Sequence, residues 1–128
     1  MIHQWKKVET RNVRSEERIT ITKSYSIGFP VKFYQDNKVA DFKYVVFYYD
    51  ETNKAIGVQF SNDENEKNKF SIIHSKKGFG GSVAVRSFFR AYNIDPLKYH
   101  ARYEWKVEDQ PGVGKLYVIN LQERQNKA

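Results

Sequence analysis

The chain has 128 residues, of which 40% are hydrophobic and 16% aromatic, and its formal net charge is +7. This composition fits one folded domain over residues 1–128 and argues against disorder along most of the chain. The absence of cysteine excludes disulfides and cysteine-based zinc sites and is typical of a cytoplasmic protein. No apolar stretch reaches the roughly 18 residues of a membrane span, and the first residues lack a signal-peptide core, so we expect no membrane partner.

The first third of the chain predicts a polar arm, two short strands and a short helix. Residues 1–17 are polar and indicate a loose arm or an irregular edge segment. Residues 19–23 alternate β-branched and polar side chains and predict a strand, and residues 26–29 predict a second strand. Because proline suits the first position of a helix, Pro30 predicts a short helix over residues 31–37.

The middle of the chain predicts a β-hairpin. Residues 44–49 form a continuous apolar and aromatic run, and the polar residues 50–54 have the composition of a turn. Residues 55–60 alternate apolar and other side chains, as a partner strand would. A charged loop over residues 61–69 follows the hairpin.

The second half predicts a strand, a glycine-rich turn, a short helix, two strands joined by a turn, and a frayed tail. These elements are expected at residues 70–74, 78–81, 86–93, 99–107, 115–121 and 122–128.

The two halves follow the same order of elements. At one offset of 56 residues, Ile27 falls on Val83 and Phe33 falls on Phe89. One such unit is too small to bury much surface alone, whereas two units packed together can share a core. We therefore expect an α+β protein, a β-rich antiparallel barrel or sheet built from two β-β-α-β-β repeats with two short helices. The expected repeats span residues 19–60 and 70–121.

The segment Thr22-Lys23-Ser24-Tyr25-Ser26-Ile27-Gly28-Phe29-Pro30 resembles the opening of the AbrB/SpoVT-type DNA-binding domain. In that family a Thr-Lys strand, a tight turn and an apolar strand ending in proline precede a short helix and a hairpin. The resemblance implies a swapped-hairpin barrel made by two copies, here within one chain. It also implies DNA contacts by basic side chains near the first turn and the helix start. The matching positions are Lys23, Lys32, Lys76, Lys77, Arg86 and Arg90.

Three features depart from that family. Tyr25 stands where the family often has glycine, and Arg86 stands in the second half where the first half has Pro30. The turn over residues 75–81 is also longer than the resemblance implies.

The basic residues gather in two regions, and the first, residues 1–23, contains six lysines and arginines against three glutamates. Residues 74–102 contain six lysines and arginines against one acid, Asp95. Residues 76–82 combine two lysines with three glycines, so backbone N–H groups and ammonium groups could both meet a phosphate. The segment lacks the spacing of a nucleotide-binding P-loop, and the alternative to a phosphate contact is an ordinary glycine turn on a solvated basic surface.

Three aromatic residues, Tyr25, Phe79 and Tyr92, lie among the basic residues in the sequence. Exposed aromatic rings beside lysine and arginine can stack on unpaired bases. The alternative is that these rings belong to the core. Both interpretations stay open at the level of the sequence.

The sequence shows no catalytic constellation. His3, His74 and His100 lack the spacing of metal ligands, and adjacent acids such as Asp50 and Glu51 fall in predicted turns. We therefore expect no enzyme, no cofactor and no metal site.

We predict a small basic nucleic-acid-binding protein that acts mainly through phosphate contacts, with DNA a more probable partner than RNA. The alternative is a protein-interaction or assembly module, with a homo-oligomer as one form of it. A small-ligand binder is the third class. The predicted nucleic-acid-binding residues are Lys23, Tyr25, Lys32, Lys76, Lys77, Arg86 and Arg90.

Overall fold

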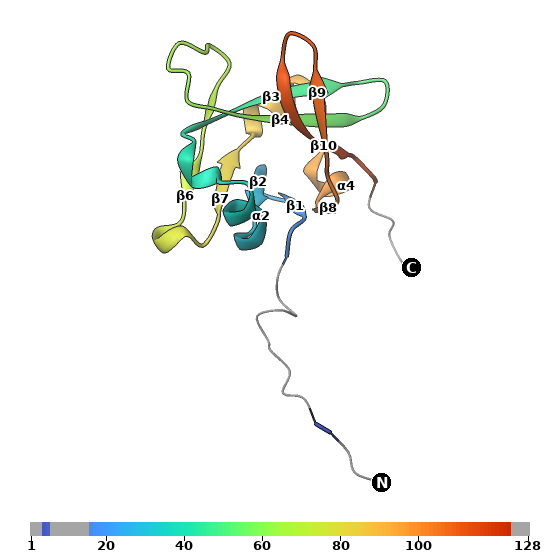
Figure 1. Cartoon of the computed structure of the whole chain (residues 1–128). Helices are drawn as coiled ribbons and strands as arrows, with labels where there is room; N and C mark the ends of the chain where they lie inside the picture. Colours follow the sequence, from blue (N-terminus) through green and yellow to red (C-terminus); the bar gives the residue numbers. More distant parts are fainter. Residues whose placement is uncertain (1–3, 6–15, 124–128) are drawn as a thin grey trace, which may run out of the picture.

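The computed structural model describes residues 4–5 and 16–123, which form two five-stranded antiparallel sheets. Sheet A has the order β6-β7-β2-β1-β8, and sheet B has the order β5-β3-β4-β10-β9. In Figure 1, β3, β4, β9 and β10 lie above β1, β2 and β8. The strands of sheet A are β1 (Ile19–Thr22), β2 (Ser26–Phe29), β6 (Ile73–His74), β7 (Gly81–Ala84) and β8 (Ala101–Tyr103). Those of sheet B are β3 (Tyr44–Asp50), β4 (Ala55–Ser61), β5 (Phe70–Ser71), β9 (Lys106–Gln110) and β10 (Gly114–Asn120).

The sheets confirm the α+β class, but they do not close into a barrel, so the barrel alternative is wrong. The strand expected over residues 70–74 is interrupted at Ile72, whose N–H donates to the carbonyl of Lys43. Its first part, β5, pairs with β3 in sheet B, and its second part, β6, pairs with β7 in sheet A. Each part has only two residues, too short for a ladder that would join the sheets.

Two of the helices lie close to their predicted positions. They are α2 (Val31–Asp36) and α3 (Arg86–Ala91), each of six residues. Single turns of 3₁₀ helix, η1 (Val39–Asp41) and η2 (Lys76–Gly78), follow α2 and precede β7.

A third helix, α4 (Pro96–Tyr99), corrects the expectation of two. Asp95 caps it by accepting a hydrogen bond from the N–H of Leu97 at 2.9 Å, and Pro96 occupies a position that needs no N–H partner. The strand expected over residues 99–107 is therefore wrong in its extent. It is divided among the end of α4, β8 and the first residues of β9.

The core lies between the sheets, and strand alternation explains its composition. Ile19, Ile21 and Ile27 of sheet A are buried in the same cluster as Ile56 and Val58 of sheet B. Successive side chains of a strand point to opposite faces, so the residues between them form the outer faces.

Both six-residue helices insert aromatic rings into this core. The Phe33 ring of α2 lies 5.1 Å from Trp105 and 5.2 Å from Tyr117. The Phe88 ring of α3 stacks on Phe47 at 5.1 Å. Each helix is thus held by the core rather than by its own short run of hydrogen bonds.

The predicted hairpin of the middle region is confirmed. β3 and β4 pair from Tyr44 opposite Ser61 to Asp50 opposite Ala55. The expected arm over residues 1–17 lies mostly outside the described residues, as does the end of the tail over 122–128. Within residues 4–5 and 16–123, no helix has the length and apolar character that crossing a bilayer requires.

Candidate nucleic-acid interface

The turn between β1 and β2 places Lys23 and Tyr25 at one end of sheet A. The Thr22 and Ser26 hydroxyls lie 2.6 Å apart, and the N–H of Ser26 donates to the Thr22 hydroxyl, so side chains close the turn. Tyr25 has a φ of 61°, a left-handed conformation that is uncommon for a bulky residue. Its carbonyl accepts a hydrogen bond from the N–H of Val85 at 2.9 Å, which ties the turn to the start of α3.

Two arginines of α3 lie over the Tyr25 ring. The guanidinium carbon of Arg86 is 4.7 Å from the ring centroid, and that of Arg90 is 5.9 Å from it. Both side chains sit on one face of α3, since residues four apart are neighbours on a helix. We name the group formed by Lys23, Tyr25, Arg86 and Arg90 the Tyr25 corner.

The Tyr25 corner carries positive charge without a local counter-ion. Lys23, Arg86 and Arg90 are exposed, and within the described part of the chain none of them forms an ion pair. The tyrosine holds the guanidinium groups by cation–π contacts, worth about 0.5–1 kcal/mol each at an exposed site. Guanidinium groups held in this way still have N–H donors for the oxygens of a phosphate.

Lys32 is in a different electrostatic setting at the start of α2. Its ammonium lies 2.8 Å from a carboxylate oxygen of Asp36 and 3.3 Å from one of Glu17. Hydrogen bonds to Asp36, then to Glu17, raise the pKa of Lys32 above its ordinary value. Two carboxylates thus pair with the Lys32 ammonium, which the sequence analysis predicted to contact a phosphate.

Lys76 lies at the far end of sheet A from the Tyr25 corner. It belongs to η2, in the loop that leads into β7 at the end where Gly81 pairs with Phe29. At about 3.3 Å per residue, the four residues of β2 separate this loop from the Tyr25 corner by roughly 13 Å. The backbone of Lys77 lies in the same turn, and its side chain is outside the described part of the structure.

The glycine-rich loop has a definite structural role. The hydroxyl and the N–H of Ser75 both donate to the carbonyl of Gly80 at 2.9 Å, so the loop is closed at its base. Gly80 has a φ of 122°, and a Cβ there would lie 2.8 Å from the carbonyl oxygen of Phe29. Glycine is therefore required where the loop approaches the end of β2.

Small polar side chains occupy the outer face of sheet A between these two ends. Thr20 pairs with Gly28, and Gly28 pairs with Ser82, so the three residues form a row across the sheet. A shallow hollow of about 330 Å³ lies over this row and is bounded by Phe79. Hydroxyl groups commonly contact the phosphates of DNA, so the face suits a polyanion that spans both ends.

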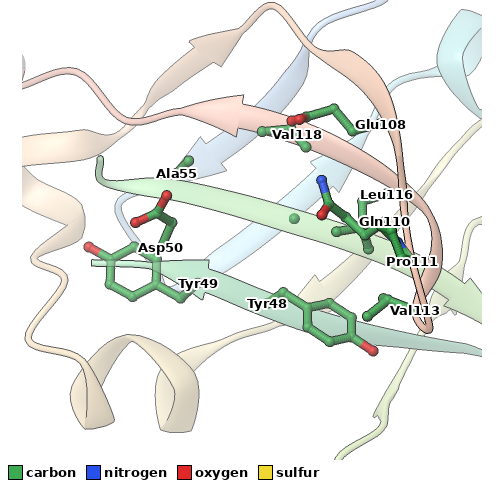
Figure 2. A pocket seen from close by; sticks show the side chains of 11 residues that line it. Tyr48, Tyr49, Asp50, Ala55, Glu108, Gln110, Pro111, Val113, Leu116 and Val118 are labelled. Carbon is green, nitrogen blue, oxygen red and sulfur yellow. The ribbon is translucent and has the colours of Figure 1, made fainter. Parts of the chain in front are cut away.

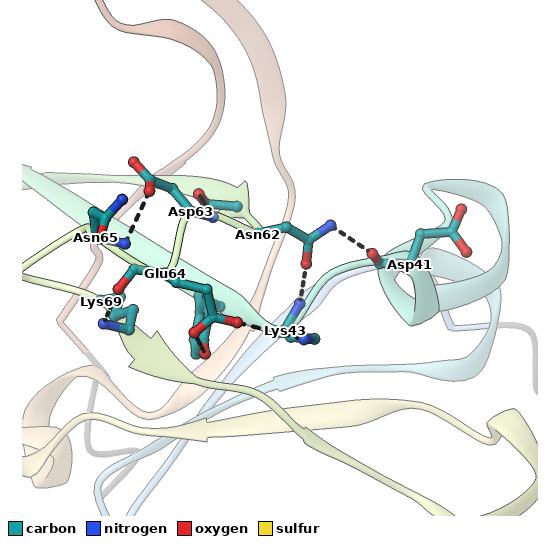
Figure 3. Close-up of polar contacts among 9 residues, drawn as sticks. Asp41, Lys43, Asn62, Asp63, Glu64, Asn65 and Lys69 are labelled. Atoms are coloured by element: carbon teal, nitrogen blue, oxygen red, sulfur yellow. Dashed lines mark hydrogen bonds and ion pairs between the residues drawn. The ribbon is translucent and has the colours of Figure 1, made fainter.

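Two side chains of the charged loop over residues 61–69, those of Asn62 and Glu64, are held by residues 41–44 outside the loop (Figure 3). Glu64 accepts a hydrogen bond from the Tyr44 hydroxyl at 2.6 Å and lies 3.4 Å from the Lys43 ammonium. The Tyr44 hydrogen bond, followed by that of Lys43, lowers the pKa of Glu64. The side chain of Asn62 fixes the start of the loop by accepting from the N–H of Lys43 and donating to the Asp41 carbonyl.

A hollow of about 370 Å³ on the outer face of sheet B does not suit an anion (Figure 2). Gly57 lies at its floor, where a Cβ would come within 3.1 Å of the Leu116 side chain, and the hollow is bordered by Asp50 and Glu108. No lysine or arginine lines it. A phosphate would meet carboxylates here rather than cations.

The imidazole ring of His74 makes two hydrogen bonds. His74 is hydrogen-bonded through Nδ1 to the Tyr34 hydroxyl at 2.7 Å and through Nε2 to the Phe42 carbonyl at 2.8 Å. In residues 4–5 and 16–123, no three His, Asp or Glu side chains are grouped as metal ligands. His3 is outside the described residues.

The structure thus brings together four of the seven predicted residues, Lys23, Tyr25, Arg86 and Arg90. It places Lys76 at the other end of the sheet and surrounds Lys32 with acids. Sequence reasoning missed the hydroxyl face of sheet A. The alternation of isoleucine with threonine in residues 19–22 could have predicted this face, because the isoleucines are buried and the threonines point away from the core.

Comparisons with protein-family models, with curated proteins and with solved structures found no match to this chain.

Proposed function

We propose that this chain binds nucleic acid mainly through phosphate contacts, with the Tyr25 corner at the centre of the interface. The observation that carries the proposal is the pair of exposed arginines over one tyrosine ring, with no described carboxylate within ion-pair distance. A group of uncompensated cations on a chain of charge +7 attracts polyanions. DNA is the partner that the AbrB/SpoVT-type resemblance implies.

The interface extends from the Tyr25 corner along the outer face of sheet A toward Lys76. Thr20 and Ser82 supply hydroxyls along this path. A phosphate backbone has one charge per roughly 3.4 Å of each strand, so several phosphates fit along the path.

The proposed duplication is supported by the pairing of β2 with β7. Ile27 lies opposite Val83, its partner at the offset of 56 residues. On either side of this pair, Ser26 faces Ala84 and Gly28 faces Ser82, the arrangement expected where two equivalent strands meet about a two-fold axis. We infer that the chain holds two copies of one β-β-α-β-β unit, which supports the swapped-hairpin resemblance.

The test is equilibrium binding of a labelled DNA duplex, measured by fluorescence anisotropy at several salt concentrations. The double variant R86A/R90A should bind about 10- to 60-fold more weakly near 0.1 M salt, because each lost phosphate contact removes a released counter-ion. The slope of log affinity against log salt should become shallower by about 1.8.

The matched control is K98A/K106A, which removes two exposed lysines from α4 and β9. This control lowers the net charge equally but leaves the Tyr25 corner intact, so its affinity should stay close to that of the wild type. Equal losses in both double variants would show a diffuse charge effect instead of a site. Absence of binding to duplex and single strand at about 50 mM salt, where phosphate contacts are strong, would overturn the proposal.

A second candidate, an assembly role, is favoured by the edge of sheet A. Ile73 lies on the edge strand β6 and is 63% exposed, and Phe79 in the neighbouring loop is also 63% exposed. An exposed apolar edge can pair with another chain. Light scattering that shows only monomer over a broad concentration range would count against this role.

A further inference from the structure

A hollow of about 440 Å³ lies between β3 and α3, within the roughly 300–1,000 Å³ range of small-molecule sites. Five of its six aromatic residues form one connected group, namely Phe47, Tyr49, Phe70, Phe88 and Tyr92. The Tyr92 ring lies 5.3 Å from Tyr49 and 5.6 Å from Phe88, and Phe88 stacks on Phe47. Tyr92 is 47% exposed, so one aromatic surface of the group is open to a ligand.

The hollow and the Tyr25 corner share helix α3. Arg86 and Arg90 lie over Tyr25, whereas Phe88 and Tyr92 line the hollow. Ser87, which also lines the hollow, follows Arg86 directly in the helix. Because a helix is about 10–12 Å wide, the cations and the aromatic group lie within the span of one or two nucleotides.

We propose that this hollow takes an unstacked base of a single-stranded nucleic acid, whose phosphates lie on Arg86 and Arg90. The inference rests on the proposed function and names its substrate class. The adjacent cations favour a polyanion over an apolar peptide, and aromatic rings beside a basic surface are the usual platform for single-strand bases. A base inside a duplex is already stacked on its neighbours and cannot enter.

The rim of the hollow indicates which bases fit. Glu66 and Asn68 line it from the loop over residues 61–69. This loop is held in place, since the Lys69 ammonium donates to the carbonyls of Glu64 and Glu66 at 3.0 Å. One oxygen of the Glu66 carboxylate accepts a hydrogen bond from the N–H of Asn68 at 3.2 Å. The other oxygen can accept one from an exocyclic amino group, which cytosine has and thymine lacks. A cytosine strand should therefore bind more tightly than a thymine strand.

The test compares oligo(dC), oligo(dT) and a duplex as ligands of the full chain and its variants. Replacing Tyr92 by serine should weaken binding of the single strands about 5- to 150-fold, the loss expected for one stacked base. Duplex binding through the Tyr25 corner should not change. E66Q should reduce the preference for oligo(dC) over oligo(dT).

Two further variants serve as controls for folding and for stacking. L97S removes an apolar side chain that is 66% exposed on α4, and it should leave all binding unchanged. Y92W should retain single-strand binding, and its added indole fluorescence should be quenched by oligo(dC) because the base stacks on it. Thermal unfolding of Y92S should show that the variant is folded.

The outcomes separate this inference from the proposed function. If R86A/R90A weakens binding while Y92S binds single strands as the wild type does, the base site is wrong and the phosphate interface stands. If Y92S weakens duplex and single strand equally, the hollow does not discriminate a base and the inference is again overturned. If no nucleic acid binds, both fail. A change of oligomeric state in Y92S, with binding intact, would instead assign the hollow to self-association.

Discussion

The two ends of β2 carry helices of equal length with opposite surface chemistry. At one end, α3 holds Arg86 and Arg90 over Tyr25, with no described carboxylate to pair with them. At the other end, Lys32 of α2 is paired with two acids, and the Tyr34 ring is buried with its hydroxyl hydrogen-bonded to His74. Among the described residues, Arg86 and Arg90 thus form no ion pair, whereas Lys32 is paired with two acids.

The buried sides of the two helices are far more alike than their surfaces. Phe33 in α2 and Phe89 in α3 are both almost completely buried, with exposed fractions of 1% and 0%. The two helices thus share the same packing requirement in the core, whereas their solvent-facing side chains differ in charge pairing. Function should therefore be separable from stability at the Tyr25 corner.

The largest expected effect tests the shared packing. Truncation of either phenylalanine, F33A or F89A, should lower the free energy of unfolding by about 3–5 kcal/mol, because each leaves a cavity in the core. Urea denaturation monitored by circular dichroism measures both. L97A, at an exposed position, should change stability by less than about 0.5 kcal/mol. A much smaller loss for one phenylalanine would show that the two helices are not equivalent in the core.

The strands were the part of the fold that local sequence predicted best. Alternation of apolar side chains located β1 and the hairpin of β3 and β4, because burial of one face imposes that period. The ends of the strand predicted over residues 99–107 were wrong. The Asp95 side chain caps α4, and this local hydrogen bond favours helix at Tyr99, where the sequence predicted the start of the strand.

The candidate site was only partly predictable, since tertiary packing decides which charges meet. The sequence named Tyr25, Arg86 and Arg90 separately, and pairing of β2 with β7 brings them into contact. It could not show that Glu17 and Asp36 would both reach Lys32. The Asp36 contact has helical spacing of four residues, but the Glu17 contact depends on how α2 packs beside β1.

The next prediction concerns the two acids, Glu17 and Asp36, that pair with Lys32 at the α2 end of β2. The double variant E17Q/D36N removes both carboxylates from Lys32, and it should strengthen duplex binding by up to about tenfold near 0.1 M salt. The salt slope should steepen by about 0.9, the value for one added phosphate contact. Anisotropy titrations with the same duplex measure both quantities.

The charge-matched control for this gain is E108Q/D109N on β9, which removes two exposed acids far from α2. It tests whether net charge alone increases affinity. If E17Q/D36N behaves like this control, the interface ends before Lys32 and is confined to the Tyr25 corner. If E17Q/D36N binds the duplex more tightly than this control, the acids around Lys32 are what keep the α2 end of β2 out of the interface.

The smallest expected effect concerns Glu16, which pairs with two further cations, Arg18 and Arg102. Its carboxylate accepts hydrogen bonds from the Arg18 backbone and guanidinium, and it lies 3.7 Å from Arg102. Hydrogen bonds from the Arg18 side chain, more than any other cause, lower the pKa of Glu16 from 4.5 to about 2. Because the folded state has the lower pKa, this contribution to stability is present above pH 4.5 and is lost as the pH falls toward 2.

E16Q should therefore be less stable than the wild type at pH 7, and the difference should shrink between pH 4.5 and pH 2. The effect is modest, since the Arg18 side chain is 41% exposed and solvent screens the pair. Urea midpoints at pH 7, 4.5 and 3 measure it, and R18Q should shift the Glu16 pKa, followed by NMR, back toward 4.5. A stability difference that stays constant with pH would mean that Glu16 acts through its shape and neutral hydrogen bonds. In that case Arg102 would keep its charge available, and the cationic surface would extend across β8 as well.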